Sequence, residues 1–400
     1  MRGPPPLTRR LSARTVTVAW LGLIALLSLW YYWPSLRWPV TFHTRDGRPV
    51  TGTRDPGDAR TILGVVESVR APRDVAGWFT RQWTPGPSNY YRPVTLLSIW
   101  LDYAVWGERP LGYRLHNLLL HIVNALLLGL VVARVAKSLW PGAVASLLVA
   151  LSGTDSAATA WLAGRADLLA CFFFLSALAL LLAIRPQEPR RYLWPLAVAA
   201  FLLALGSKEI AVSLPALVTA WMFLWPRPLA RRRRALIALS LWVALGVFWI
   251  VRARALGGVT SAAWSLDQAM GHVGWRNYAE FLARPLTAWY YELPWIGWIS
   301  LLTPSFWSFI LYQAVYWGCA ALMLTTARAA TIAFFVWKVV VTPPILGATH
   351  FFVWLHYWYL PSMGSAALAG IAVWQVARLA PRWWARLVAR LRQMEVRLTT

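Results

Sequence analysis

Residues 90–124 read YYRPVTLLSIWLDYAVWGERPLGYRLHNLLLHIVN and connect a long polar segment to a strongly apolar one. The apolar part is long enough to cross a bilayer, so the junction is expected at a membrane edge. Arg, Asp, His and Asn nevertheless occur among its aromatic and aliphatic residues. Polar groups there are costly and commonly serve a site. The stretch therefore predicts a functional face on one side of a membrane protein.

The composition of the 400-residue chain is typical of such a protein. Hydrophobic residues make up 58% and charged residues 14%, and the mean hydropathy is +0.50. The 28 Trp and 14 Tyr suit helices that end at the bilayer interface. The net charge of +24 does not indicate a nucleic-acid partner, because the basic residues interrupt apolar spans instead of forming a soluble patch. Cys171 and Cys319 fall inside apolar spans and form no metal motif.

Arginines before the first apolar segment, residues 15–33, place the amino terminus in the cytoplasm. The polar segment 34–110 then lies outside the cell membrane. Nine more apolar segments follow and give about ten spans with both termini inside: 111–132, 141–154, 166–184, 192–206, 210–225, 235–251, 305–326, 329–347 and 357–376. We therefore expect an all-α polytopic membrane domain over residues 1–378. Residues 379–400 are expected to form a basic amphipathic helix on the inner leaflet.

The acidic residues indicate where the chemistry takes place. Of the fifteen Asp and Glu, only Glu188 and Glu395 fall clearly in predicted cytoplasmic segments. Carboxylates gathered on the outer side favour a site on that side. The alternative is that arginine-rich inner loops simply exclude acids, since orientation rules concern Lys and Arg only.

Four segments resemble one family. They are YRP, LDY, GY and NLLLH within 91–121, TAWLAGRADLLACFFFLSAL at 159–178, GSKEIAV at 206–212 and YWYLPS at 357–362. Their sequences and their order along the chain resemble those of the transmembrane O-mannosyltransferases that carry tetratricopeptide repeats, and of their bacterial relatives in the GT-C superfamily. The resemblance implies a GT-C-type helical bundle, with the first outer loop packed as interfacial helices over the site. No repeat domain is expected after the tail.

The resemblance also implies a reaction. A sugar leaves a polyprenyl phosphate and joins an acceptor on a protein, lipid or glycan. We expect this transfer at the outer face of a bacterial cytoplasmic membrane, because the chain is compact and rich in Arg, Ala and Leu. Such a transfer needs a carboxylate to take the acceptor's proton. It also needs cations to hold the leaving phosphate as its charge develops. We expect a polyprenyl-phosphate-linked sugar and the lipid bilayer as partners, with the sugar and the acceptor left open.

The first outer loop holds the candidate bases. Family members place paired acids there, followed by an aliphatic residue four positions later. Asp58 has Ile62 at that spacing, although Gly57 occupies the place of its partner. Asp58 is therefore the predicted base, with Asp55 and then Asp46 behind it. The alternative is that all three acids are turn residues in a Gly/Pro-rich loop.

The second outer loop departs further from the family. A His-Pro pair and a Glu are usual before the tryptophan equivalent to Trp161, whereas this chain has Ser152-Gly153 and Ala157 there. Asp155 is the remaining acid and is predicted as a supporting carboxylate.

Two cations at predicted outer helix ends are candidates for the donor phosphate. Arg165 could bind phosphate through its fork of donors; the alternative is an interfacial arginine beside Asp167. Lys208 is assigned the same role, with a local ion pair to Glu209 as its alternative.

The remaining site residues are expected to form the wall of the site: Tyr91, Arg92, Asn117, His121, Glu209, His356, Tyr357 and Tyr359. Asn117, His121 and Asn124 share a helical face, so interhelical hydrogen bonding is an alternative use of them. No cofactor and no protein-built metal site are predicted, and a divalent metal requirement is left open. Lys338 matches nothing in the family, but an intramembrane lysine is itself a functional-site hypothesis.

Two other functions compete with catalysis. The missing family acids favour a catalytically inactive GT-C-like scaffold that binds lipid or a partner protein. A secondary transporter would usually show internal repeats with paired broken helices, and the sequence shows none.

Overall fold

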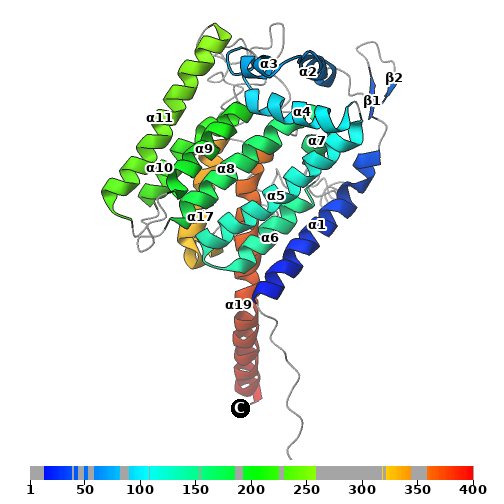
Figure 1. Ribbon diagram of the computed structural model, residues 1–400. Coiled ribbons are helices and arrows are strands. Elements are labelled where there is room, and N and C mark those ends of the chain that lie inside the picture. The colour runs from blue at the N-terminus through cyan, green and yellow to red at the C-terminus, as the bar shows by residue number, and fades with distance from the viewer. Residues whose placement is uncertain are drawn as a thin grey trace, which may run out of the picture.

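The computed structural model describes residues 13–37, 40–43, 49–52, 58–81, 90–107, 109–152, 155–184, 192–224, 229–257, 318, 321–343 and 358–399. The described chain is a bundle of helices with a layer of short elements at one end (Figure 1). The predicted helical fold class is therefore confirmed. The first outer loop adds a small antiparallel hairpin of β1 (Val40–His43) and β2 (Pro49–Gly52), which the sequence reading did not predict.

The elements fall into two groups. The bundle consists of α1 (Ala13–Arg37), α5 (Pro110–Ala136), α6 (Leu139–Ala150), α8 (Arg165–Ala183), α9 (Leu193–Ser207), α10 (Leu214–Leu224), α11 (Arg231–Leu256), α17 (Arg328–Val341) and α19 (Tyr359–Thr399). The short elements are α2 (Asp58–Glu67), α3 (Pro72–Gly77), α4 (Pro93–Trp106), α7 (Asp155–Ala160) and the 3-10 turns η1 (Leu162–Gly164) and η2 (Glu209–Ser213).

Local sequence explains the break between α4 and α5. Each helix begins with a proline, Pro93 or Pro110, at the first helical position, where the missing N–H has no helical partner to lose. Gly107 follows α4 with a φ of 55°, in the region that favours glycine. The chain therefore turns from the layer of short elements, where α4 lies, into the long apolar helix α5 (Figure 1).

Four described helical segments are long and apolar enough to cross a membrane: Pro110–Ala136, Leu162–Ala183, Arg231–Leu256 and Tyr359–Pro381. Four shorter apolar segments accompany them, and one of these contains α6 with 12 residues. At 1.5 Å per residue such a helix falls short of a hydrocarbon core of about 30 Å. The count of ten spans stays a prediction, since most of the predicted span 305–326 lies outside the described residues.

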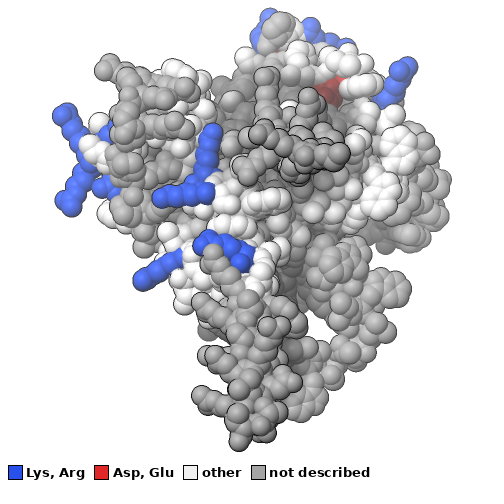
Figure 2. All heavy atoms as spheres, turned by 90° about the horizontal axis from the view of Figure 1, so that it is seen from below, with Lys and Arg blue, Asp and Glu red and all other residues white. Residues whose placement is uncertain are grey.

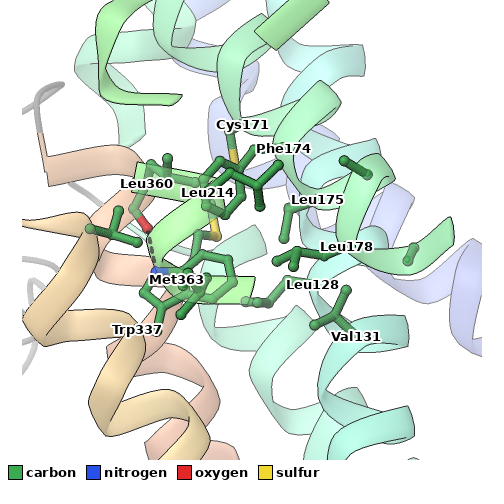
Figure 3. Packing of buried hydrophobic residues seen from close by; sticks show 14 of the residues in the cluster. Leu128, Val131, Cys171, Phe174, Leu175, Leu178, Leu214, Trp337, Leu360 and Met363 are labelled. Carbon is green, nitrogen blue, oxygen red and sulfur yellow. Dashed lines mark hydrogen bonds between the residues drawn. The ribbon is translucent and has the colours of Figure 1, made fainter. Parts of the chain in front are cut away.

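The core of the bundle lies between α5, α8, α17 and the first half of α19 (Figure 3). Leu128, Phe174 and Trp337 are fully buried there. The indole N–H of Trp337 donates to the carbonyl of Leu360 over 3.1 Å, which satisfies its polar atom inside an apolar cluster. Close contact of this kind is what holds helices together within a bilayer.

α5 and α6 approach each other closely because glycines face one another. A Cβ added at Gly142 would lie 2.2 Å from the carbonyl oxygen of Gly129. Ser146 Oγ also donates to Ala125 O across this contact, over 2.9 Å. Small residues and a short polar bond are typical of tight packing between membrane helices.

We expect Gly142→Ala to destabilise the protein by about 1–3 kcal/mol, because the added methyl group must push two backbones apart. Gly246→Ala on α11 is the matched control, since a Cβ there meets nothing within 4 Å and alanine favours a helix over glycine. Thermal unfolding of both variants in detergent measures the difference. Equal unfolding temperatures would show that α5 and α6 can move apart to accept the methyl group without loss of stability.

The two ends of the bundle differ in charge. The described acids Asp74, Asp102, Asp167 and Glu209 lie at the end covered by α2 and α3. Basic residues gather at the other end: Arg134, Lys137, Arg231–Arg234, Arg328 and Arg378. Figure 2 views that end and shows Lys and Arg around it with little Asp or Glu. The described acids named here thus lie at one end of the bundle, whereas basic residues occur at both ends, and the membrane side of each end stays a prediction.

The carboxyl-terminal tail is helical through Thr399, as predicted. It is continuous with the last apolar span, however, and α19 runs for 41 residues with Pro381 inside it. In Figure 1 the tail extends α19 away from the bundle, so it is no separate helix. Its predicted position along the inner leaflet stays untested.

Candidate functional site

The first outer loop covers the acidic end of the bundle through a small apolar cluster. Ile62 is fully buried and Trp78 is 2% exposed, and both pack with residues of α4, α5 and η1. α2 therefore lies over α4, held by the aliphatic residue that follows Asp58 by four positions. Asp58 is the first residue of α2, and its side chain lies outside the described part of the chain. Asp55 and Asp46 lie outside it altogether.

A tight turn between α9 and η2 positions two charged residues. α9 ends at Ser207, and Lys208 adopts an extended conformation. Gly206 permits the close approach of α4, since a Cβ there would lie 2.7 Å from Val94 Cγ2. Thr95 Oγ1 also donates to the carbonyl of Ser207 over 3.0 Å. Lys208 and Glu209 consequently enter the protein interior beside α4 and α8.

Arg165, at the start of α8, is fully buried. Its guanidinium contacts five groups on α4 and α5: Asn117 Oδ1 through Nε, Ser98 Oγ (2.8 Å) and His116 Nδ1 (3.1 Å) through Nη1, and Asp102 Oδ2 (2.6 Å) and Tyr113 O (3.1 Å) through Nη2. His116 Nδ1 also lies 2.7 Å from Asp102 Oδ1. The arginine therefore binds three helices together.

These contacts correct the assignment of Arg165 as a phosphate ligand. Its donors are already directed to protein groups, and no part of the side chain is exposed. The alternative, an interfacial arginine beside Asp167, is also wrong because the carboxylate that pairs with Arg165 is Asp102. Sequence reasoning did not select Asp102 or His116 as site residues. The available signal was a carboxylate within an apolar stretch, which is rarely without a partner.

Two further ion pairs lie next to this cluster. Lys208 Nζ donates to both carboxylate oxygens of Asp167, over 2.6 and 2.7 Å. Glu209 Oε2 accepts from Nε and Nη2 of Arg92, over 3.2 and 2.8 Å. The Arg92 guanidinium also lies 4.4 Å from the centre of the Tyr90 ring. The carboxylate in close contact with Lys208 is therefore Asp167, whereas Glu209 pairs with Arg92 and interacts with Lys208 only through longer-range electrostatics. Lys208 faces a carboxylate where a phosphate ligand was predicted.

Most of the buried charges in this region are paired. Among the described residues, Asp102, Asp167 and Glu209 neutralise Arg165, Lys208 and Arg92. Arg252 and Arg114 are further buried cations, and Arg252 interacts electrostatically with Glu209 and Arg92. A buried positive charge outside the described ion pairs attracts an anion.

The residues predicted as the site wall have different roles. Asn117 Nδ2 donates to Trp161 O over 3.0 Å and so fixes the second outer loop. His121 Nδ1 lies 2.8 Å from the hydroxyl of Tyr359, and Asn124 Nδ2 donates to Leu168 O over 3.0 Å. The alternative of interhelical hydrogen bonding is therefore confirmed for this helical face.

Tyr91 is a buried residue of the outer layer. Its hydroxyl donates to Phe79 O over 2.9 Å, and burial raises the pKa of Tyr91 above its usual value. It therefore remains a neutral donor that ties the first outer loop to the start of α4. His356 and Tyr357 lie outside the described residues.

Three further expectations concern Asp155, Lys338 and a metal site. Asp155 begins α7, but its side chain lies outside the described part of the chain, so its supporting role stays a prediction. Lys338 is fully buried in α17 and interacts with other groups. The described residues contain no group of three His, Cys, Asp or Glu suited to a metal, and the expectation of no metal site stays untested.

Comparisons with known proteins agree with the predicted resemblance. No family model matches the chain. The protein O-mannosyl-transferase Tmtc1 of Drosophila melanogaster is 37% identical over 100 residues, which are 25% of this chain and 12% of that protein. Human TMTC3, also a protein O-mannosyl-transferase, is 33% identical over 119 residues, or 29% of this chain and 13% of that protein. The chain thus matches a small part of each relative.

Among solved structures, the archaeal oligosaccharyltransferase AglB of Archaeoglobus fulgidus, in complex with an inhibitory peptide and a dolichol-phosphate, has a TM-score of 0.54 and 13% identity. The alignment covers 94% of this chain and 52% of that one. At this identity the likeness concerns the fold. The chain therefore shares the fold of that part of the oligosaccharyltransferase and, over about a quarter of its length, resembles the TMTC O-mannosyltransferases in sequence.

Proposed function

We propose that this protein is a membrane glycosyltransferase that moves a sugar from a polyprenyl-phosphate donor to an acceptor at the acidic end of the bundle. The observation that carries the proposal is the buried ionic network beneath α2. Three ion pairs connect α4, α8 and the α9–η2 turn, and a fourth cation lies beside them. These elements coincide with segments that resemble the O-mannosyltransferases.

The proposed roles follow from position. Asp58, at the amino-terminal end of α2, takes the proton of the acceptor as the sugar is transferred. Arg165 and Asp102 are positioning residues, because they fix α4, α5 and α8 relative to each other beneath α2. A rigid frame of this kind holds the reacting groups in place and lowers the entropic part of the barrier.

A lipid-linked donor fits this arrangement. The solved oligosaccharyltransferase of the same fold type was bound to a dolichol-phosphate, which is a polyprenyl phosphate, and the names of the sequence relatives indicate mannose. We place the reaction on the outer face of a bacterial cytoplasmic membrane, because the arginine-rich end of the bundle is then cytoplasmic.

Sealed vesicles containing the purified protein test both the reaction and its side. The donor is radiolabelled polyprenyl-phosphate mannose, and the acceptor is a membrane-impermeant peptide rich in Ser and Thr. We expect transfer when the acidic end faces the peptide and none when the basic end does. Transfer in the opposite orientation alone would contradict the topology. No transfer from mannose, glucose or N-acetylglucosamine donors to peptide, lipid or glycan acceptors would contradict the function.

An inactive lipid-binding scaffold is the second candidate. The observation that favours it is that all three described carboxylates of the network are ion-paired, while the second outer loop lacks the usual family acids. The same vesicles distinguish the two functions, since a scaffold would bind polyprenyl phosphate without transferring sugar.

A further inference from the structure

Arg252, near the carboxyl-terminal end of α11, is a buried charge beside the network. Its side chain is 2% exposed, yet its Nε has no hydrogen-bond partner among the described residues. None of the described ion pairs of the network includes it. Its guanidinium lies 5.0 Å from the centre of the Trp249 ring. A buried charge that is not in direct contact with a carboxylate is costly unless another group completes its hydrogen bonds.

Glu209 carries the matching acceptor. Both of its hydrogen bonds from Arg92 use Oε2, while Oε1 is buried and has no partner among the described residues. Arg252 and Glu209 interact electrostatically, so an unused donor and an unused acceptor occur in one buried cluster. Buried polar atoms are nearly always hydrogen-bonded, so two unpaired ones close together call for a partner such as water, an ion or a ligand.

We propose that Arg252 binds the phosphate of a glycosyl phosphate and that Glu209 Oε1 accepts a hydrogen bond from a hydroxyl of its sugar. A glycosyl phosphate presents anionic oxygens and hydroxyl groups close together, which complements a guanidinium with an unpaired Nε and a carboxylate with an unpaired Oε1 in the same buried cluster. The guanidinium fork suits phosphate oxygens in particular. The ligand's identity rests on the proposed function, whereas the site rests on the two unpaired groups.

The first experiment measures binding of polyprenyl phosphate without sugar to the detergent-solubilised full chain. We expect Arg252→Gln to weaken it about 10- to 100-fold, since a hydrogen bond to a charged group is lost. Arg254→Gln is the matched control, because Arg254 lies on the same helix and is exposed. Equal affinities of the two variants would overturn the site. The unfolding temperature of each variant checks that it is folded.

Competitors identify the source of the phosphate. We expect inorganic phosphate at millimolar concentration to displace polyprenyl phosphate weakly, and phosphatidylglycerol not to displace it. Equal competition by phosphatidylglycerol would overturn the carrier specificity and indicate a general lipid headgroup site.

The second experiment tests the sugar contact. We expect Glu209→Gln to weaken polyprenyl-phosphate mannose about tenfold relative to polyprenyl phosphate, because only the sugar-bearing ligand uses Oε1. An unchanged ratio of the two affinities would overturn the proposed hydrogen bond between Glu209 and the sugar. Binding is read out separately from transfer. If the protein binds both ligands through Arg252 but transfers no sugar, the proposed binding site is supported and the proposed function is contradicted.

Discussion

The Asp58→Asn variant is expected to transfer sugar about 10²–10⁴-fold more slowly than the wild type, which is the usual loss when a general base is removed. Asn preserves the size and polarity of the side chain but has no basic oxygen. Asp58 begins α2, and Ile62 anchors that helix in the apolar cluster over α4. Donor binding should change little, because the variant leaves the buried cations intact.

Asp55→Asn and Asp46→Asn are the matched controls for this prediction. Both acids belong to the same outer loop, and both precede α2, the helix that begins at Asp58 and is anchored by the buried Ile62. We expect each to retain most of the activity. A variant at Asp58 that transfers sugar at the wild-type rate would remove Asp58 from the mechanism. A large loss at Asp55 instead would move the base there.

The Asp102→Asn variant is expected to lose about 3–5 kcal/mol of stability, which is typical when one partner of a buried ion pair is removed. Arg165 would keep its charge at zero exposure without its carboxylate partner. Its contacts reach α4 and α5, so the loss should loosen several helices at once. The unfolding temperature in detergent and the monodisperse yield after purification measure the effect.

The double variant Asp102→Leu with Arg165→Met is the control for this prediction. Replacing both residues of a buried ion pair by apolar residues is often neutral or stabilising, because no unpaired charge is left buried. We therefore expect the double variant to be more stable than Asp102→Asn. An unfolding temperature for Asp102→Asn equal to that of the wild type would contradict the role of Arg165 as the connection between α4, α5 and α8.

Several features of the fold follow from the sequence. Apolar segments predict spanning helices because backbone polar groups must be satisfied within the bilayer, and α1, α5, α8 and α11 lie where these segments were expected. The family resemblance implied helices in the first outer loop, and α2 lies there with Ile62 fully buried. The hairpin of β1 and β2 escaped prediction because its short strands lie in a polar, Gly-rich loop with little alternation.

The tertiary structure alone decided which charges pair. Neighbours along the chain favoured Arg165 with Asp167 and Lys208 with Glu209, but residues one or two positions apart do not face each other on a helix. The pairs that form join residues 63, 41 and 117 positions apart. They depend on how α4, α8 and the α9–η2 turn meet, and that meeting follows from close packing at Gly206 and beneath α2. The sequence by itself therefore determined where the charged residues enter the bundle. The packing of helices distant in sequence determined that Arg165 and Lys208 pair with Asp102 and Asp167 and that Arg252 lies outside the described ion pairs.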